Sequence, residues 1–242
     1  MKTTVVVPTY NEAENLPKLV EILFSLPLPD LHLLIVDDNS PDGTGKLADD
    51  FAAQTHGRVI VLHRSGKLGL GTAYTAGFKQ AIQNGAEAIA QMDADFSHPP
   101  EKLVEMHQVL QTCSVVLGSR YVAGGKLDEH WPLWRKTLSG WGNFYARTIL
   151  RMPMRDVTGG FRMWRREALQ SMPLERVRSN GYVFQVEMAY LAHRLGFSFC
   201  EIPIYFADRQ FGQSKMSVRI QIEAAFRVWQ LIGSYRDVHP QE

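Results

Sequence analysis

At residues 88–95 the chain reads Ala88-Ile89-Ala90-Gln91-Met92-Asp93-Ala94-Asp95, an apolar run that ends in two carboxylates one residue apart. Alternate side chains of a β-strand lie on one face, so the pattern predicts that Asp93 and Asp95 point the same way where a buried strand ends. Two carboxylates at this spacing can hold Mg²⁺ and leave coordination positions for water and a diphosphate. A solvated turn after a buried strand is the simpler alternative, and the neighbouring motifs decide between the two.

Strands and helices alternate through the first half of the chain. Besides the run that begins at Ala88, apolar strands are predicted at Thr3–Val7, His32–Val36, Val59–Leu62 and Ser114–Leu117. Helices are predicted between them. The first has Asn11 as N-cap and Glu14 three residues later, which resembles a capping box. This order predicts an α/β fold, with a mostly parallel sheet and helices on both faces.

Polar clusters follow four of these strands. They are Pro8–Glu12, Asp37–Asp42, Asp93–Asp95 and Ser119–Arg120. Open α/β sheets bind their ligands beyond the carboxyl ends of the strands. Because four polar clusters converge on that edge, we predict the binding site there.

The second half of the chain is less regular. Helices are predicted at Trp134–Leu150 and Val183–Leu195, and Pro203 interrupts a strand at Phe199–Phe206. The last helix carries an apolar stripe formed by Val218, Ile222, Ala225, Phe226, Trp229 and Ile232. No linker divides the chain, which predicts a single domain over residues 1–242.

The composition excludes several classes of protein. The 242 residues are 45% apolar and carry a net charge of +1, enough for a sizeable core and too balanced to attract nucleic acid. No apolar stretch reaches the about 18–20 residues that span a bilayer, and the chain opens on a strand rather than a signal peptide. Cys113 and Cys200 lie in apolar runs and are predicted to be buried thiols in a reducing compartment. We expect a cytoplasmic protein that at most lies on a membrane.

A glycine-containing segment, Gly69-Leu70-Gly71-Thr72-Ala73-Tyr74, matches the dinucleotide-binding fingerprint poorly. Tyr74 replaces the third glycine, and the segment does not follow the first strand. A Walker A loop is absent from the sequence. The sheet is therefore of a nucleotide-binding type without that fingerprint.

Three motifs resemble those of the family 2 glycosyltransferases. Val7–Leu16 looks like their opening motif, Asp37–Thr44 like their second motif, and Asp93-Ala94-Asp95 like their Asp-x-Asp signature. Narrower matches, in order along nearly the whole chain, resemble the polyprenol-phosphate mannosyltransferases, also called dolichol-phosphate mannose synthases. These matches are Leu68–Tyr74, Gly118–Tyr121, Thr158–Arg162, Gly181–Gln185 and Gln213–Lys215.

The resemblance implies a GT-A type fold, GDP-mannose as donor and a polyprenyl phosphate as acceptor. Residues 1–122 would form the nucleotide-binding half and residues 123–235 the acceptor half. The residues implied to line the nucleotide base and ribose are Pro8, Tyr10, Glu12, Val36 and Asp38. Those implied to border the diphosphate and its Mg²⁺ or Mn²⁺ are Met92, Asp93, Ala94 and Asp95, with Asp93 and Asp95 as metal ligands.

Cations are implied on the phosphates as well. Arg120, Arg209 and Lys215 would neutralise the diphosphate or the acceptor phosphate and, with Asp95, form the catalytic set. This fits the chemistry, because the departing diphosphate is a polyanion whose charge must be stabilised. Ordinary surface charge is the alternative for each of the three cations. In the aligned helix of the family, Arg135 and Ser139 would meet the acceptor phosphate.

A phosphate acceptor needs no general base, since its second pKa of about 6 leaves it anionic near neutral pH. Many family members that act on hydroxyls carry a late Glu-Asp pair, whereas here Glu187 is followed by Met188. Glu187 is either such a base or an ordinary hydrogen-bonded helix residue. We expect one in-line displacement with inversion, which gives a β-linked mannosyl phosphate.

The lipid tail of the acceptor requires an apolar surface. Candidates for it are Trp131, Trp134, Trp141, Phe144, Phe226 and Trp229, although such stripes are more often core. We expect peripheral contact with a membrane or a membrane-anchoring partner. Two alternatives stay open: UDP-glucose or another nucleotide sugar as donor, and a non-catalytic subunit that binds nucleotide sugar. The intact Asp93 and Asp95 pair argues against the second.

Overall fold

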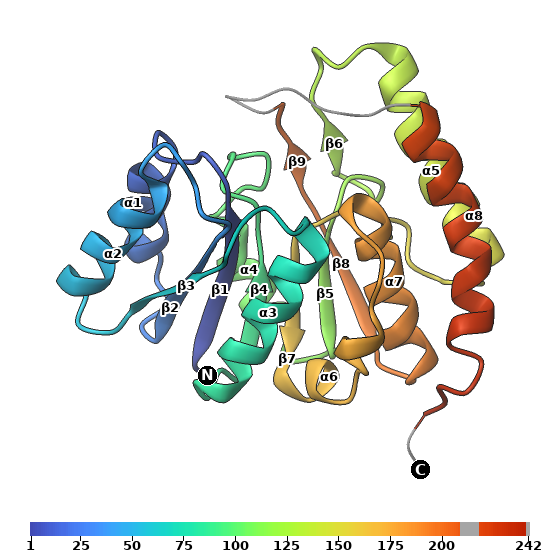
Figure 1. Cartoon of the computed structure of the whole chain (residues 1–242). Helices are drawn as coiled ribbons and strands as arrows, with labels where there is room; N and C mark the ends of the chain where they lie inside the picture. The colour runs from blue at the N-terminus through green and yellow to red at the C-terminus, as the bar shows by residue number, and fades with distance from the viewer. Residues whose placement is uncertain (209–217, 241–242) are drawn as a thin grey trace.

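The computed structural model describes residues 1–208 and 218–240 (Figure 1). The strands are β1 (Thr3–Thr9), β2 (Leu31–Asp37), β3 (Val59–His63), β4 (Ala88–Gln91), β5 (Val115–Ser119), β6 (Lys126–Leu127), β7 (Arg162–Arg165), β8 (Phe199–Pro203) and β9 (Tyr205–Phe206). The helices are α1 (Leu16–Ser25), α2 (Thr44–Gln54), α3 (Leu70–Gln83), α4 (Lys102–Val109), α5 (Leu133–Ile149), α6 (Arg166–Gln170), the 3₁₀ turn η1 (Leu174–Arg176), α7 (Gly181–Arg194) and α8 (Val218–Ser234). In the described part of the chain, no helix is both long and apolar enough to cross a membrane.

Seven strands form one sheet, in the order β3-β2-β1-β4-β7-β5-β8. Of these, only β7 runs antiparallel to its neighbours β4 and β5. A second, two-stranded sheet pairs β6 with β9. The predicted α/β fold with a mostly parallel sheet is therefore confirmed, and β7 brings the second half of the chain into the middle of the sheet.

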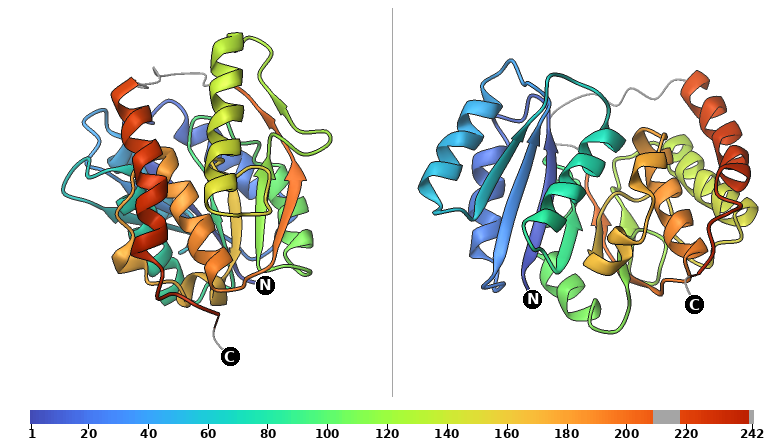
Figure 2. Two further views of the ribbon diagram at one scale, coloured as in Figure 1. Left: turned by 90° about the vertical axis from the view of Figure 1, so that its right-hand side faces the viewer. Right: turned by 60° about the horizontal axis from the view of Figure 1, so that its bottom comes forward.

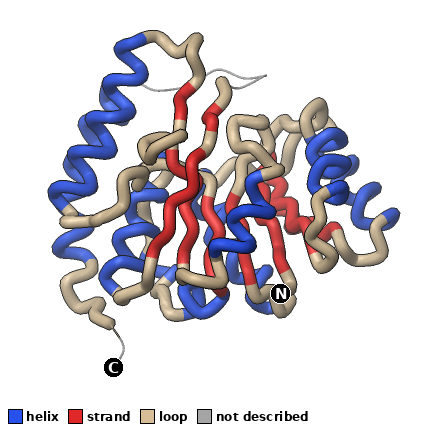
Figure 3. The backbone as a smooth tube through the Cα atoms, turned by 180° about the vertical axis from the view of Figure 1, so that it is seen from behind, coloured by secondary structure: helices blue, strands red, loops and turns tan. Residues whose placement is uncertain are grey.

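Helices cover both faces of the large sheet, as Figures 2 and 3 show from other sides. In β1, Val5 and Val7 join the hydrophobic cluster that contains α1 and α4, whereas Val6 joins the cluster that contains α3 and α7. Successive side chains of a strand point to opposite faces, so a strand buried on both faces is apolar throughout. This explains why the sequence of β1 does not alternate.

Helix α1 begins later than the capping-box prediction required. Its N-cap is Asn15 rather than Asn11, and Asn11 has a left-handed φ of 62°. Side chains of the loop that precedes α2 accept hydrogen bonds from the backbone of residues 11–13. The Asn11 N–H donates to Ser40 Oγ at 3.1 Å, and the Ala13 N–H donates to Asp42 Oδ2 at 3.1 Å. The capping-box prediction was wrong because long-range hydrogen bonds hold this segment in a loop.

The apolar stripe predicted for α8 does not face the core. Phe226 is 67% exposed and Trp229 57% exposed, whereas Val228, Leu231 and Tyr235 are buried. The helix therefore carries two apolar faces, and periodicity alone could not tell which one packs inward. The side chains of Val218 and Ile222 lie outside the described set.

Candidate active site

The carboxyl ends of β1, β2 and β4 meet at one edge of the sheet. Thr9 pairs with Asp37 and Val6 with Gln91, and backbone bonds extend this register beyond the strands. The Asp38 N–H donates to Thr9 O at 3.0 Å, and the Met92 N–H donates to Val6 O at 3.2 Å. Three of the predicted polar clusters thus begin side by side, as the strand order requires.

The two acidic residues lie beyond β4 rather than within it, because the strand ends at Gln91. The Asp93 N–H donates to His98 Nδ1 at 3.0 Å. Asp95 is 7% exposed, and its Oδ1 accepts from the Ser97 N–H at 3.1 Å and the Ser97 hydroxyl at 2.6 Å. The prediction that strand alternation aligns the two carboxylates was wrong: hydrogen bonds in the loop fix them instead.

Tyr74 on α3 orients Asp93. Its hydroxyl donates to Asp93 Oδ1 at 2.7 Å, and its ring stacks between those of Phe78 and Phe184. Burial, together with the negative charge of Asp93, raises the pKa of Tyr74 well above its ordinary value, so the phenol stays a donor. Sequence analysis assigned no role to Tyr74, and its signal was a tyrosine in place of a motif glycine.

His98 is a structural residue in this loop. It is 2% exposed, stacks on Phe161 at a centroid distance of 5.3 Å and accepts the Asp93 N–H. Through this bond His98 helps to fix the backbone of the loop that carries Asp93.

The predicted nucleotide wall divides into surface and core residues. Pro8, Tyr10 and Glu12 are half-buried, and Glu12 Oε2 accepts from the Asn15 side chain at 2.8 Å. The side chains predicted to border a ligand but found buried in the core are those of Val36, Met92 and Ala94. Only the backbone of these three can face a ligand.

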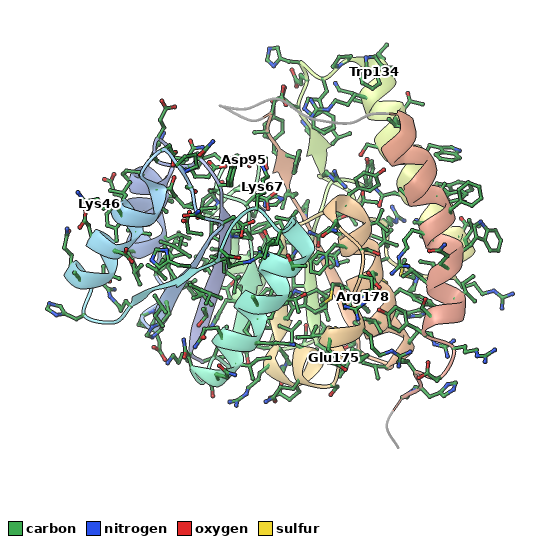
Figure 4. All side chains as sticks on the ribbon, viewed as in Figure 1. Lys46, Lys67, Asp95, Trp134, Glu175 and Arg178 are labelled. Carbon is green, nitrogen blue, oxygen red and sulfur yellow. The ribbon has the colours of Figure 1, made fainter. Side chains whose placement is uncertain are left out.

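Two cations that the sequence reasoning missed lie beside this wall. Arg64 Nη1 is 3.0 Å from Asp38 Oδ1 in a nearly buried ion pair, and its Nη2 donates to Thr72 at 2.7 Å. Burial raises the pKa of Asp38 although Arg64 opposes the shift. Lys67 Nζ lies 4.0 Å from the centroid of the Tyr10 ring, and Figure 4 shows Lys67 and Asp95 at the same edge of the sheet.

Arg120 follows β5 but is tightly paired. Its Nε and Nη2 donate to Asp156 at 2.7 Å each, its N–H donates at 2.9 Å, and Nη2 also donates to Thr158 at 2.8 Å. Burial opposes ionisation of Asp156, but the adjacent Arg120 charge outweighs it and lowers the pKa. Asp156 therefore already compensates the charge of Arg120. The role of Arg120 on a diphosphate stays a prediction.

The implied acceptor residues lie on α5. Arg135 Nη1 contacts Asp208 Oδ1 at 3.1 Å and its guanidinium lies over the Trp131 ring at 3.6 Å. Ser139 Oγ accepts from the Tyr121 hydroxyl at 2.7 Å, which ties α5 to the residue after Arg120. Arg209 and Lys215 lie outside the described residues.

The donor set fits a hard divalent cation. Asp93 and Asp95 offer carboxylate oxygens, and hydroxyls of Tyr74 and Ser97 hold one oxygen of each. Within the described residues no group of three or more His, Cys, Asp or Glu side chains could hold a metal. Mg²⁺ and similar ions are commonly bound by one or two carboxylates plus water and substrate phosphates, and hydrogen-bonded ligands are typical of such sites.

Relatives of known activity match nearly the whole chain. A polyprenol monophosphomannose synthase of Mycolicibacterium smegmatis is 44% identical over 235 residues, which is 96% of this chain and 88% of that protein. An undecaprenyl-phosphate mannosyltransferase of Micrococcus luteus is 43% identical over 228 residues, 94% of this chain and 93% of that protein.

Solved structures show the same fold at low sequence identity. Glucosyl-3-phosphoglycerate synthase of Mycobacterium tuberculosis, with Mn²⁺, UDP-glucose and phosphoglyceric acid, aligns with a TM-score of 0.66 at 16% identity, over 100% of this chain and 81% of that chain. A mannosyltransferase of Pyrobaculum calidifontis, with GDP-Man and Mn²⁺, aligns with a TM-score of 0.60 at 18% identity, over 98% of this chain and 63% of that chain. These likenesses establish a GT-A fold.

The model of the family described as "Glycosyl transferase family 2" matches residues 4–172, which include β1 apart from Thr3, the segment Asp93–Asp95 and the Arg120–Asp156 pair. With that match and two relatives above 40% identity, the chain belongs to glycosyl transferase family 2 and is a glycosyltransferase.

Proposed function

We propose that this enzyme transfers mannose from GDP-mannose to a polyprenyl phosphate. The observation that carries the proposal is the 44% identity, over 96% of the chain, to a polyprenol monophosphomannose synthase. The proposal is supported by the carboxylate pair at the sheet edge, which suits a metal, and by the nearby Tyr10 ring and Lys67 ammonium, which suit a base and a phosphate.

In the proposed reaction an oxygen of the lipid phosphate forms a bond to C1 of mannose while the bond from C1 to the GDP oxygen breaks. The products are GDP and the mannosyl phosphate lipid, with inversion at C1. No proton has to be removed, because a phosphate monoester is already an anionic nucleophile near pH 7.

Glu187 is placed where it cannot act as a base on an acceptor. It is fully buried, and its oxygens accept from the Ser179 N–H at 2.7 Å and the Tyr235 hydroxyl at 2.6 Å. Arg227 of α8 lies 3.6 Å away. These contacts support the interpretation of Glu187 as a hydrogen-bonded helix residue. An acceptor that is a phosphate needs no such base.

Mg²⁺ or Mn²⁺ would be held by Asp93 and Asp95, where it would supply charge stabilisation to the departing diphosphate. Arg120, Arg209 and Lys215 are proposed to add positive charge to the same phosphates, and Arg135 and Ser139 to bind the acceptor phosphate. The half-buried face of Tyr10 is proposed to line the base.

The apolar surface that we propose for the lipid lies on α5 and α8, which lie side by side (Figures 1 and 2). Trp229 Nε1 donates to the Tyr145 hydroxyl at 3.0 Å, which joins the two helices. The large apolar side chains exposed along them are Leu133, Trp134, Trp141, Phe144, Phe226, Trp229 and Ile232. Such an aromatic surface is typical of proteins that lie on a membrane, so peripheral contact is part of the proposal. Trp131 is buried and takes no part.

The experiment that tests the proposal measures GDP release from GDP-mannose with Mn²⁺, with and without a short polyprenyl phosphate. We expect release only when the lipid phosphate is present, with the mannosyl phosphate lipid detected by mass spectrometry. UDP-glucose in place of GDP-mannose is the matched control. Faster turnover of UDP-glucose, or no turnover with any lipid phosphate, would overturn the proposal.

Tyr74→Phe tests the metal site. Removing the hydroxyl deprives Asp93 of its 2.7 Å hydrogen bond, and loss of such an orienting group typically costs roughly 10- to 100-fold in metal affinity. Titration of turnover with Mn²⁺ measures the shift. Tyr190→Phe, which removes the hydroxyl of a buried tyrosine on α7, should leave the titration unchanged. An unaltered Mn²⁺ dependence in Tyr74→Phe would mean that Tyr74 does not orient a metal ligand.

A further inference from the structure

A cavity of about 390 Å³ opens beside α5, on a different face from the one that meets α8. Its walls include Tyr121, Phe144, Arg147 and Arg155. Residues three or four apart lie on one face of a helix, so Phe144 and Arg147 face the cavity together. Tyr145, one residue on from Phe144, turns away and donates to Ala225 O of α8 at 3.2 Å.

Two positive charges, those of Arg147 and Arg155, line the cavity. Within the described residues, neither Arg147 nor Arg155 forms an ion pair. The Glu201 carboxylate, which lies beside Arg155, binds the backbone rather than either guanidinium group. Glu201 accepts the Arg155 N–H at 2.8 Å and the Asp156 N–H at 3.0 Å through its two oxygens, and Asp156 is paired with Arg120. Among the described residues, an anion would therefore find two guanidinium groups here that are not paired with a carboxylate.

The position of the cavity points to a lipid. Phe144 is 65% exposed and belongs both to the cavity wall and to the apolar surface of α5 and α8. When that surface meets a bilayer, long basic side chains beside it reach the level of the headgroups. Guanidinium groups bind phosphate in a planar, bidentate geometry.

We propose that this cavity binds the phosphate of an anionic membrane phospholipid through Arg147 and Arg155. The proposal rests on the proposed peripheral membrane contact. The bound lipid is distinct from the acceptor: it orients α5 on the membrane and undergoes no reaction. The enzyme would thus prefer anionic bilayers over neutral ones.

Vesicle flotation tests the proposal with the full-length enzyme. The vesicles are phosphatidylcholine alone or phosphatidylcholine mixed with phosphatidylglycerol. We expect Arg147→Gln/Arg155→Gln to bind the anionic vesicles at least about 10-fold more weakly than the wild type, and the neutral vesicles equally well. Lys46→Gln/Lys79→Gln, which removes the same charge from exposed positions on α2 and α3, is the matched control and should stay within about two-fold. Figure 4 shows Lys46 on the opposite side of the molecule from Trp134 on α5.

The outcomes separate the two proposals. If the wild type binds neither kind of vesicle, the membrane contact itself fails and this proposal falls with it. Equal binding of wild type to both kinds, or equal losses in the two double variants, would overturn the phospholipid site alone. Turnover of a short, soluble polyprenyl phosphate should be unchanged in Arg147→Gln/Arg155→Gln. A loss there would assign the cavity to the acceptor instead.

Discussion

Asp95→Ala is expected to lower metal-dependent turnover by roughly 1,000-fold while the protein stays folded. The carboxylate is 7% exposed at the sheet edge and would be one of two ligands for Mg²⁺ or Mn²⁺. Without it the charge that develops on the departing diphosphate loses its main stabilising group, and such losses appear in kcat as well as in kcat/KM. Steady-state kinetics over a Mn²⁺ titration, with a thermal melt of the same sample, measures both effects.

Ser97→Ala is the matched control for Asp95→Ala. It removes the 2.6 Å hydrogen bond to Asp95 Oδ1 and so loosens the same loop, but it keeps the carboxylate. We expect a loss of roughly 10- to 100-fold, smaller than that of Asp95→Ala, because only the orientation of a ligand is affected. Turnover of Asp95→Ala at the wild-type rate would remove Asp95 from the metal site.

The convergence of the polar clusters at one sheet edge could be predicted from the sequence because it depends on short-range patterns. Apolar runs such as Thr3–Val7 marked the strands, and parallel strands in an α/β sheet place their carboxyl ends at one edge. The segments after these runs therefore had to converge, as the backbone bonds from Asp38 and Met92 to β1 show.

The contacts within the site depend on residues far apart in the chain, which no local pattern reports. Arg120 and Asp156 are 36 residues apart, and nothing near Arg120 indicates that its charge is already paired. Likewise Arg64 pairs with Asp38 because each directly follows one of two paired strands, β3 and β2, whose last residues His63 and Asp37 are in register. Helix α8 has two apolar faces. The face with Leu231 packs into the cluster that contains α7, whereas Trp229 on the other face stays exposed.

The largest loss of stability is expected when the Arg120–Asp156 pair is broken. The Asp156 side chain is completely buried, and it accepts two hydrogen bonds at 2.7 Å from the Arg120 guanidinium and one at 3.0 Å from the Gly159 N–H. Burial lowers the pKa of the nearby Arg162 to about 9, and the negative charge of Asp156 opposes that shift. Asp156→Asn keeps the volume but leaves buried positive charge uncompensated.

Breaking a buried pair in this way costs about 3–5 kcal/mol. For a chain of this size, we expect Asp156→Asn to lower the Tm by roughly 10 °C. Asp237→Asn is the control, because Asp237 also forms two hydrogen bonds with an arginine, Arg176, but on the surface, at 61% exposure. Solvent screens an exposed pair, so its removal should change the Tm by little more than the error of the measurement. Equal shifts in the two variants would mean that burial does not set the strength of the Arg120–Asp156 pair.

The pH dependence of stability separates a charge effect from a packing effect in Asp156→Asn. The pKa of Asp156 is lower in the folded protein than in the unfolded chain, where it is about 4. The ionised carboxylate therefore stabilises the fold above about pH 4, and this contribution is lost as the pH falls towards the folded-state pKa. The difference in unfolding free energy between wild type and Asp156→Asn should be full at pH 7 and shrink below about pH 4, as urea unfolding at each pH would measure. A difference that stays constant from pH 7 to pH 3 would show that altered packing, and not the lost charge, destabilises the variant.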